Sequence, residues 1–196
     1  MDYNQYIFSL EGEWEGTLKS KNTIEPTLEF LQHAYKIKFI HRRVALKEDL
    51  IYYLDQAVKA KYSNYNLIHL AFHGSSKEIW MADNKSSVGL EELAERYEGR
   101  FKGRTVHFGS CKTLKASPAE LEYFLKMTEA ELVSGYTVDV DFIDSAIFEI
   151  AYFTWMQEYK QKWRVPIKLK DEYPLLFERL GFVALSKKSS DIIMTE

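Results

Sequence analysis

The sequence predicts an α/β fold: a three-layer α/β/α sandwich with a mostly parallel central sheet. Apolar, β-prone segments alternate along the chain with segments whose apolar residues recur at helical spacing. Strands that alternate with helices are typical of parallel sheets covered on both faces. The 196 residues, 46% hydrophobic and 28% charged, suit one globular domain. No linker or internal repeat interrupts the pattern, so we expect a single domain over residues 1–196.

The first part of the chain is predicted to hold three strands and two helices. A β-prone run begins at Tyr6 and ends before Gly12. Pro26 suits the first turn of a helix whose apolar face includes Leu28 and Leu31. The predicted strands cover residues 6–10, 37–44 and 66–72, and the predicted helices cover residues 23–35 and 47–61.

The second part continues the alternation after a hairpin. Ser117, followed by Pro118 and by Glu120 at the third position, is a strong helix start. The hairpin is predicted at 78–82 and 86–89, further strands at 105–110, 131–140 and 182–185, and helices at 90–97, from 118, at 145–162 and at 173–180.

Charge and composition exclude several classes of function. A net charge of −3 and an isoelectric point near 6.0 provide no overall basic field, so we expect no nucleic-acid partner. No stretch reaches the ~18 apolar residues of a membrane span, and we expect no membrane association. The N-terminus resembles no secretory signal, and a lone cysteine forms no internal disulfide. These features predict a cytoplasmic protein.

The chemistry of the sequence centres on one histidine and the only cysteine. The apolar run 66–72 leads into His73 and Gly74, and the apolar run after Thr105 leads into Cys111. Ligands of parallel sheets bind at the carboxyl ends of the strands, where these residues would meet. An imidazole beside a thiol is what a cysteine nucleophile and its base require. Gly74 and Cys111 would also offer backbone N–H groups to an oxyanion.

Two other interpretations of these residues compete with a catalytic pair. In the first, Cys111 is a small buried residue and His73 an ordinary hydrogen-bonded strand end. In the second, His69, His73, His107 and Cys111 hold a metal ion. Residues four apart on one strand are ~13 Å apart, whereas zinc needs ligands at ~2 Å. We therefore expect no metal and no cofactor.

The two motifs together resemble the caspase-like, or clan CD, cysteine peptidases. The motifs are Leu67-Ile68-His69-Leu70-Ala71-Phe72-His73-Gly74 and Val106-His107-Phe108-Gly109-Ser110-Cys111. This superfamily includes caspases, metacaspases, legumain, gingipain, separase and CHAT domains. The similarity is greatest to CHAT and separase domains, in which a later strand carries a glycine–aromatic step and acids, similar to residues 135–141 here. It covers roughly residues 62–156 and implies a caspase-like fold.

The resemblance implies an activity and roles for particular residues. Cys111 would be the nucleophile and His73 the general base of an endopeptidase that forms an acyl-enzyme. Either Asp139 or Asp141 would lie in the specificity pocket and select Arg or Lys, on one face of the predicted strand if alternation persists. The alternative is a helix N-terminus: Asp141 and Asp144 precede the helix predicted from Ser145, where acids favour the helix dipole. Expected partners are a protein or peptide substrate and a separate regulatory protein.

Two functions of other classes stay open at this stage. A catalytically inactive caspase-like scaffold would bind partners and leave Cys111 unreactive. A flavodoxin-like domain would bind a small ligand, with His73 and Cys111 coincidental, although the sequence lacks the glycine-rich phosphate loop that such a domain favours.

Overall fold

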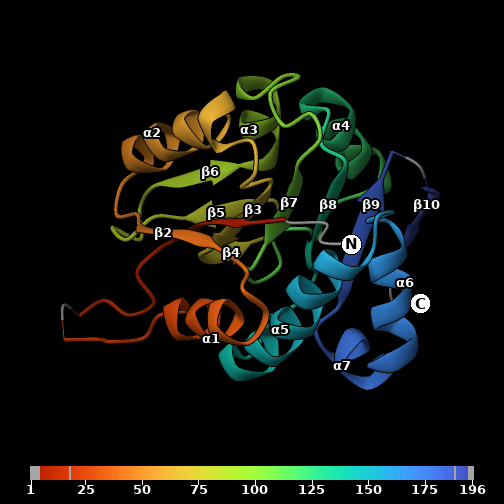
Figure 1. Ribbon diagram of the computed structural model, residues 1–196. Coiled ribbons are helices and arrows are strands. Elements are labelled where there is room, and N and C mark those ends of the chain that lie inside the picture. The colour runs from red at the N-terminus through yellow and green to blue at the C-terminus, as the bar shows by residue number, and fades with distance from the viewer. Residues whose placement is uncertain (1–4, 18, 188, 194–196) are drawn as a thin grey trace.

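A mostly parallel sheet runs through the molecule, as the sequence predicts. The computed structural model describes residues 5–17, 19–187 and 189–193 (Figure 1). The sheet has the order β10-β9-β8-β7-β3-β1-β2, in which β9 and β10 run antiparallel to their neighbours and the other pairs are parallel. Its strands are β1 (Ile7–Glu11), β2 (Phe39–Arg43), β3 (Leu67–Ala71), β7 (Thr105–Phe108), β8 (Leu132–Tyr136), β9 (Phe182–Ser186) and β10 (Ser189–Ile193).

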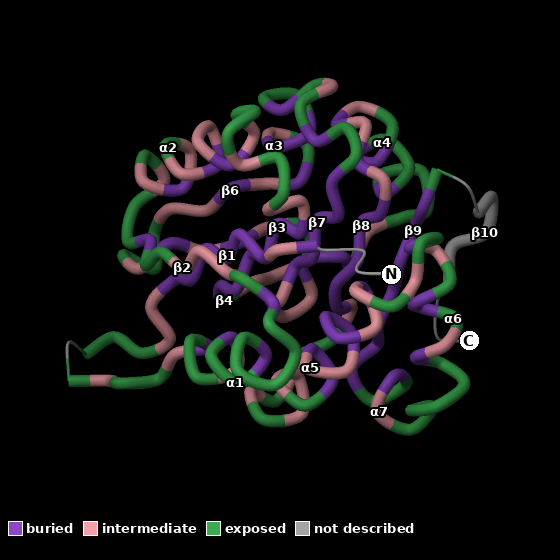
Figure 2. Tube along the Cα trace, in the orientation of Figure 1, coloured by how far each residue is buried: buried purple, intermediate pink, exposed green. Residues whose placement is uncertain are grey.

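Helices cover both faces of this sheet and form a hydrophobic core on each. One core packs α2 (Lys47–Ala57), α3 (Leu90–Arg96) and α4 (Pro118–Thr128) against the sheet. The other packs α1 (Glu25–Tyr35), α5 (Phe142–Glu158), α6 (Arg164–Glu172) and α7 (Pro174–Arg179). Figure 2 shows the buried strands between these exposed helical layers. Burial on both faces explains why the strands are near-continuous apolar runs in the sequence.

The predicted hairpin is present, and it belongs to a second, smaller sheet. Strands β4 (His73–Ser75), β5 (Glu78–Trp80) and β6 (Ser87–Gly89) pair antiparallel in that order. His73 therefore begins β4, whereas the sequence predicts that it ends the preceding strand. The main-sheet strand β3 stops at Ala71, and the chain then turns into the small sheet.

Most predicted helices are confirmed, and the ends of two strands are not. Ser117 caps α4 as predicted: its hydroxyl accepts from the Glu120 N–H at 3.3 Å, and the Glu120 carboxylate accepts from the Ser117 N–H at 2.8 Å. Strand β7 ends at Phe108, so Cys111 lies in the turn that follows. Strand β8 ends at Tyr136, and the expectation that Asp139 and Asp141 share a strand face is wrong.

Helix α6 and strands β4 and β10 are missing from the sequence prediction. Pro166 inside Arg164–Glu172 argues against a helix there, but it falls in the first turn, where the absent N–H costs nothing. Among the described residues, no helix combines the length and the apolar character needed to cross a membrane.

Candidate functional site

Strand register brings His73 and Cys111 toward one edge of the sheet. Parallel pairing of β3 with β7 places His69 opposite His107. His73 and Cys111 each follow four residues later, at the carboxyl ends. Contact is made through Gly74, where a Cβ would lie 2.4 Å from the Cys111 carbonyl oxygen and 2.4 Å from Thr113 Oγ1. Only glycine permits this approach, so the two predicted motifs do meet. We call His73 and Cys111 the edge pair.

The imidazole of His73 is exposed and is oriented by a tryptophan. Its Nε2 lies 2.8 Å from the Trp14 carbonyl oxygen, and the two rings meet edge to face with centroids 5.5 Å apart. A carbonyl oxygen only accepts, so Nε2 carries the proton and donates. In the neutral ring the free lone pair is therefore on Nδ1, which is the atom left to act as a base.

Trp14 is in turn held by a buried glutamate that sequence analysis missed. Glu11, at the end of β1, is fully buried and accepts a hydrogen bond from the Trp14 indole N–H. It also accepts from the Thr23 hydroxyl at 2.7 Å, the Ile24 N–H at 2.8 Å and His41 Nε2 at 2.7 Å. Burial alone would raise the pKa of Glu11, but these hydrogen bonds outweigh it and lower the pKa. The only sequence signal is an acid that closes an apolar strand.

The Cys111 thiol is half-buried and faces the segment that leads into α5. Its Sγ lies 3.4 Å from the Val140 N–H nitrogen, which can donate to it, and 3.8 Å from the Val140 carbonyl oxygen. Within the described part of the chain, no hydrogen bond joins Sγ to the imidazole of His73. The backbone of the two motifs is thus assembled, while the thiol is engaged with Val140.

The two candidate specificity acids have different partners. Asp141 is the N-cap of α5, and its carboxylate accepts from the Ile143 N–H at 2.8 Å and the Asp144 N–H at 3.1 Å. This matches the helix-terminus alternative. Asp139 is largely exposed and forms an ion pair with Lys112, the residue after Cys111. Of the two, only Asp139 has a charged partner that a ligand could replace.

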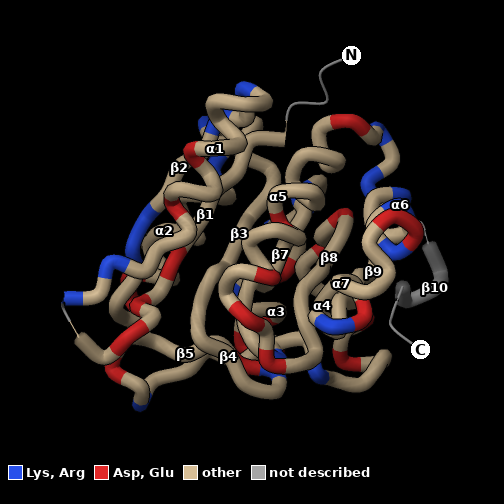
Figure 3. Tube along the Cα trace, turned by 90° about the horizontal axis from the view of Figure 1, so that it is seen from below, with Lys and Arg blue, Asp and Glu red and all other residues tan. Residues whose placement is uncertain are grey.

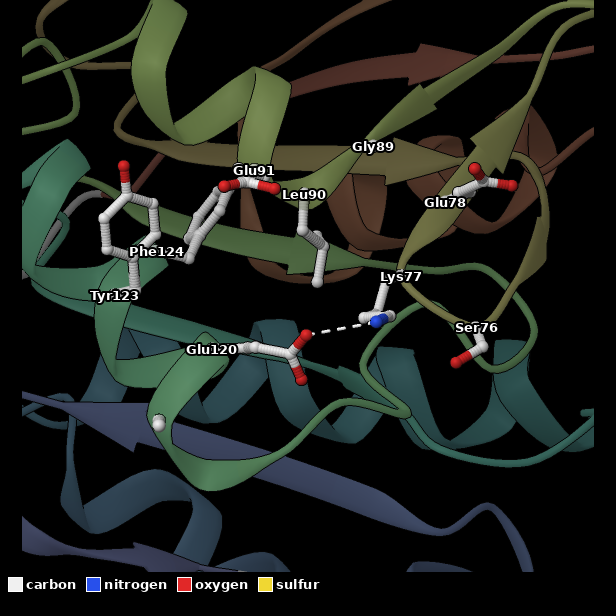
Figure 4. Close-up of a pocket in the computed structure, with 10 residues that line it drawn as sticks. Ser76, Lys77, Glu78, Gly89, Leu90, Glu91, Glu120, Tyr123 and Phe124 are labelled. Atoms are coloured by element: carbon white, nitrogen blue, oxygen red, sulfur yellow. Dashed lines mark hydrogen bonds and ion pairs between the residues drawn. The ribbon is translucent and has the colours of Figure 1, made fainter.

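A cavity lies near the edge pair and is not lined by either residue of it. It measures about 450 Å³ and lies between the β4–β5 turn and the first turns of α3 and α4 (Figure 4). Lys77 and Glu120 form an ion pair at 3.0 Å in this cavity, and the apolar side chains of Leu90 and Phe124 also line it. The Lys77 N–H donates to the Thr113 carbonyl at 3.2 Å, so the turn that lines this cavity also supports the loop after Cys111.

Charged residues of both signs are spread along the chain. Figure 3 shows Lys and Arg in short separate groups among Asp and Glu along the trace.

Comparison with known proteins adds a family and no activity. Residues 4–184 match the model of DUF6642, a family of unknown function. A search of curated proteins found no match.

Proposed function

Because this chain belongs to the DUF6642 family, whose function is unknown, we propose an activity from its own geometry: a caspase-like cysteine endopeptidase with a His73–Cys111 dyad. The observation that supports it most is the close approach of Gly74 to Cys111, where a Cβ on residue 74 would lie only 2.4 Å from the Cys111 carbonyl oxygen. Two strand-derived motifs, one carrying an imidazole and one a thiol, leave the sheet edge in contact. Nucleophilic catalysis by cysteine needs an imidazole near the thiol, and the contact between the two motifs supports the proposal of such a pair.

The proposed catalytic cycle assigns a role to each group of the site. Nδ1 of His73 takes the thiol proton, and Cys111 Sγ attacks the scissile carbonyl carbon. The backbone N–H groups of Gly74 and Cys111 stabilise the oxyanion, and His73 then protonates the leaving amine. Water, activated by His73, hydrolyses the thioester and restores the thiol. The Trp14 carbonyl keeps Nε2 protonated and the ring in place throughout.

The proposed substrates are proteins or peptides with Arg or Lys before the cleaved bond. Asp139 supports this choice, since its present cationic partner, Lys112, sits next to the nucleophile. A substrate guanidinium or ammonium would take the place of Lys112. Asp141 is the weaker candidate because its carboxylate already caps α5. A lone thiol nucleophile stays reduced in the cytoplasm, which is the compartment we propose.

One observation favours the inactive scaffold as a second candidate. The thiol contacts Val140, and in the described residues it has no hydrogen bond to His73. A scaffold would keep this arrangement permanently. A latent peptidase would release the thiol when a separate regulatory protein or a substrate moves the segment before α5.

Alkylation by iodoacetamide tests the dyad, because every modification event reports Cys111. We expect the wild type to react rapidly at pH 6–7, where a free thiol with a pKa of ~8.5 is mostly protonated. His73→Ala should slow this reaction by tenfold or more, that is, by about 1.4 kcal/mol in activation free energy. His33→Ala, at an exposed histidine of α1, is the matched control and should react as the wild type does.

Cleavage of Arg- and Lys-containing peptides then separates the two candidates. Turnover that is lost in Cys111→Ser and in His73→Ala supports the peptidase. Slow alkylation that is indifferent to His73, with no cleavage, contradicts an assembled dyad in this state of the chain and supports the scaffold.

A further inference from the structure

A second group of chemically active side chains lies inside the molecule, below the edge pair. His69 of β3, His107 of β7 and Glu149 of α5 are all buried, and we call them the buried cluster. His69 Nε2 lies 3.6 Å from Glu149 Oε2, and His107 Nε2 lies 3.3 Å from Glu149 Oε1. One nitrogen or oxygen from each residue falls within 4.8 Å of the other two. Two imidazoles therefore face one carboxylate.

The outer nitrogen of each imidazole has its own hydroxyl partner. His69 Nδ1 lies 3.2 Å from Ser9 Oγ, and His107 Nδ1 lies 3.0 Å from Ser134 Oγ. A histidine that binds a metal characteristically donates its other N–H to such a partner, which fixes the tautomer and the ring orientation. With both Nδ1 atoms donating to serine, both Nε2 atoms present lone pairs to the space beside Glu149.

The spacing within the cluster suits an ion better than direct hydrogen bonds. Charge-assisted N–H···O contacts are typically ~2.7–2.9 Å, shorter than the 3.3 and 3.6 Å seen here. Among the residues that the structure describes, buried His69 Nε2 has no hydrogen-bond partner. Ligands placed tetrahedrally at ~2.0–2.1 Å from zinc are themselves ~3.3–3.4 Å apart, close to both observed separations.

Gly109 keeps the space between these ligands open. A Cβ at this position would lie 2.5 Å from His69 Nε2 and 3.0 Å from Glu149 Oε1. Any other residue would therefore push a carbon between the imidazole and the carboxylate.

We propose that His69, His107 and Glu149 bind a divalent transition-metal ion, with zinc the best fit. Two imidazole nitrogens and a carboxylate oxygen supply three donors of the kinds that zinc prefers. The carboxylate offsets part of the ion's charge, and its hydrogen bond from the Tyr136 hydroxyl at 3.1 Å holds it in position. The site is buried, so the ion enters as the chain folds and ties β3, β7 and α5 together. The distance between residues along one strand argues against a metal site, whereas the β3–β7 register places histidines of two strands side by side.

Refolding the full chain from denaturant with Zn²⁺ or Co²⁺ tests the site. After removal of free metal, we expect about one ion per chain by elemental analysis and a higher Tm than in chain refolded with chelator. Co²⁺ should give the intense visible absorption of tetrahedral coordination. Wild-type protein that refolds but retains no ion, with an unchanged Tm, overturns the proposal.

Variants identify the ligands. Glu149→Gln and His69→Gln should each lose the bound ion and the Co²⁺ absorption, whereas His33→Gln should keep both. Cys111→Ser should also keep both, since the Cys111 thiol is not a ligand. The same variant would abolish the proposed peptidase activity, so failure of the metal proposal can be distinguished from failure of the peptidase proposal. If the ligand variants do not fold, the wild-type stoichiometry and the Co²⁺ spectrum of Cys111→Ser decide. Retention of the ion in folded Glu149→Gln, or its loss in Cys111→Ser or His33→Gln, overturns the assignment.

Discussion

The buried cluster and the edge pair differ in what holds them in place. His73 follows His69, and Cys111 follows His107, by four residues along the chain. His69 and His107 are paired by the β3–β7 register and enclosed by side chains of α5. His73 and Cys111 lie beyond the last main-sheet residues of both strands, and their contacts come from Trp14 and Val140 in connecting segments. Strand register fixes which residues are neighbours only where the strands are paired. Beyond the paired residues, the connecting loops determine the contacts.

This difference in surroundings predicts that the buried cluster and the edge pair tolerate substitution unequally. The buried cluster is packed among aromatic rings, with Phe153 meeting both imidazoles at centroid distances of 5.2 and 5.7 Å. Close-packed interiors resist volume changes, whereas loops at the strand ends can adjust and carry function. Substitutions should therefore cost stability in the cluster and reactivity at the edge.

Gly109→Ala should have the largest effect on stability. The added carbon meets His69 and Glu149 in a buried space with little room to relax, which should lower the free energy of unfolding by about 2–3 kcal/mol. Urea denaturation measures the change. Gly16→Ala is the matched control, because a Cβ there meets no atom of the described residues within 4 Å. Equal stabilities of the two variants would contradict the rigid picture of the cluster.

Glu11→Gln should have an intermediate effect, and one that depends on pH. The amide cannot accept from all the donors that face Glu11, so we expect a loss of about 1–3 kcal/mol near neutral pH. The folded-state pKa of Glu11 is lowered, so its contribution is present above the ordinary value of 4.5 and is lost as pH falls through the folded-state pKa. Wild type and variant should therefore converge in stability in acid, as measured by urea titrations at several pH values.

The same variant also sharpens the comparison between the two sites. Loosening Trp14 should slow Cys111 alkylation without changing the metal content expected of the buried cluster. Parallel losses at both sites would show that Glu11 supports the whole fold and not the edge alone.

Lys112→Met should have the smallest effect on stability. The Lys112–Asp139 pair is exposed, and such pairs contribute at most about 1 kcal/mol. On the proposed specificity, freeing Asp139 should raise kcat/KM for Arg and Lys peptides, and Asp139→Asn should lower it by about tenfold. Peptide kinetics with a neutral substrate as control measure this. Unchanged kinetics in both variants would remove Asp139 from the specificity proposal.

The periodicity of apolar residues in the sequence predicts much of the fold. It predicts little of the geometry of the site. The capping pattern at Ser117 and the apolar runs of β3 and β7 are local signals, and these elements are present. Strand ends depend on pairing with neighbours, so the predicted strand over residues 131–140 runs past Tyr136, where β8 stops. Helix α6 is not predicted because proline disrupts the interior of a helix, whereas Pro166 lies in the first turn, where proline is tolerated.

By itself, the sequence determined the alternation of strands and helices and the two motifs that carry His73 and Cys111, because both depend on residues close together in the chain. Only the tertiary structure decided that His69 faces His107, that Glu149 joins them from α5, and that Glu11 holds Trp14 against His73. Apart from Glu11 and Trp14, which are three residues apart, these neighbours are distant in sequence and are brought together by the fold of the sheet and by helix packing across it.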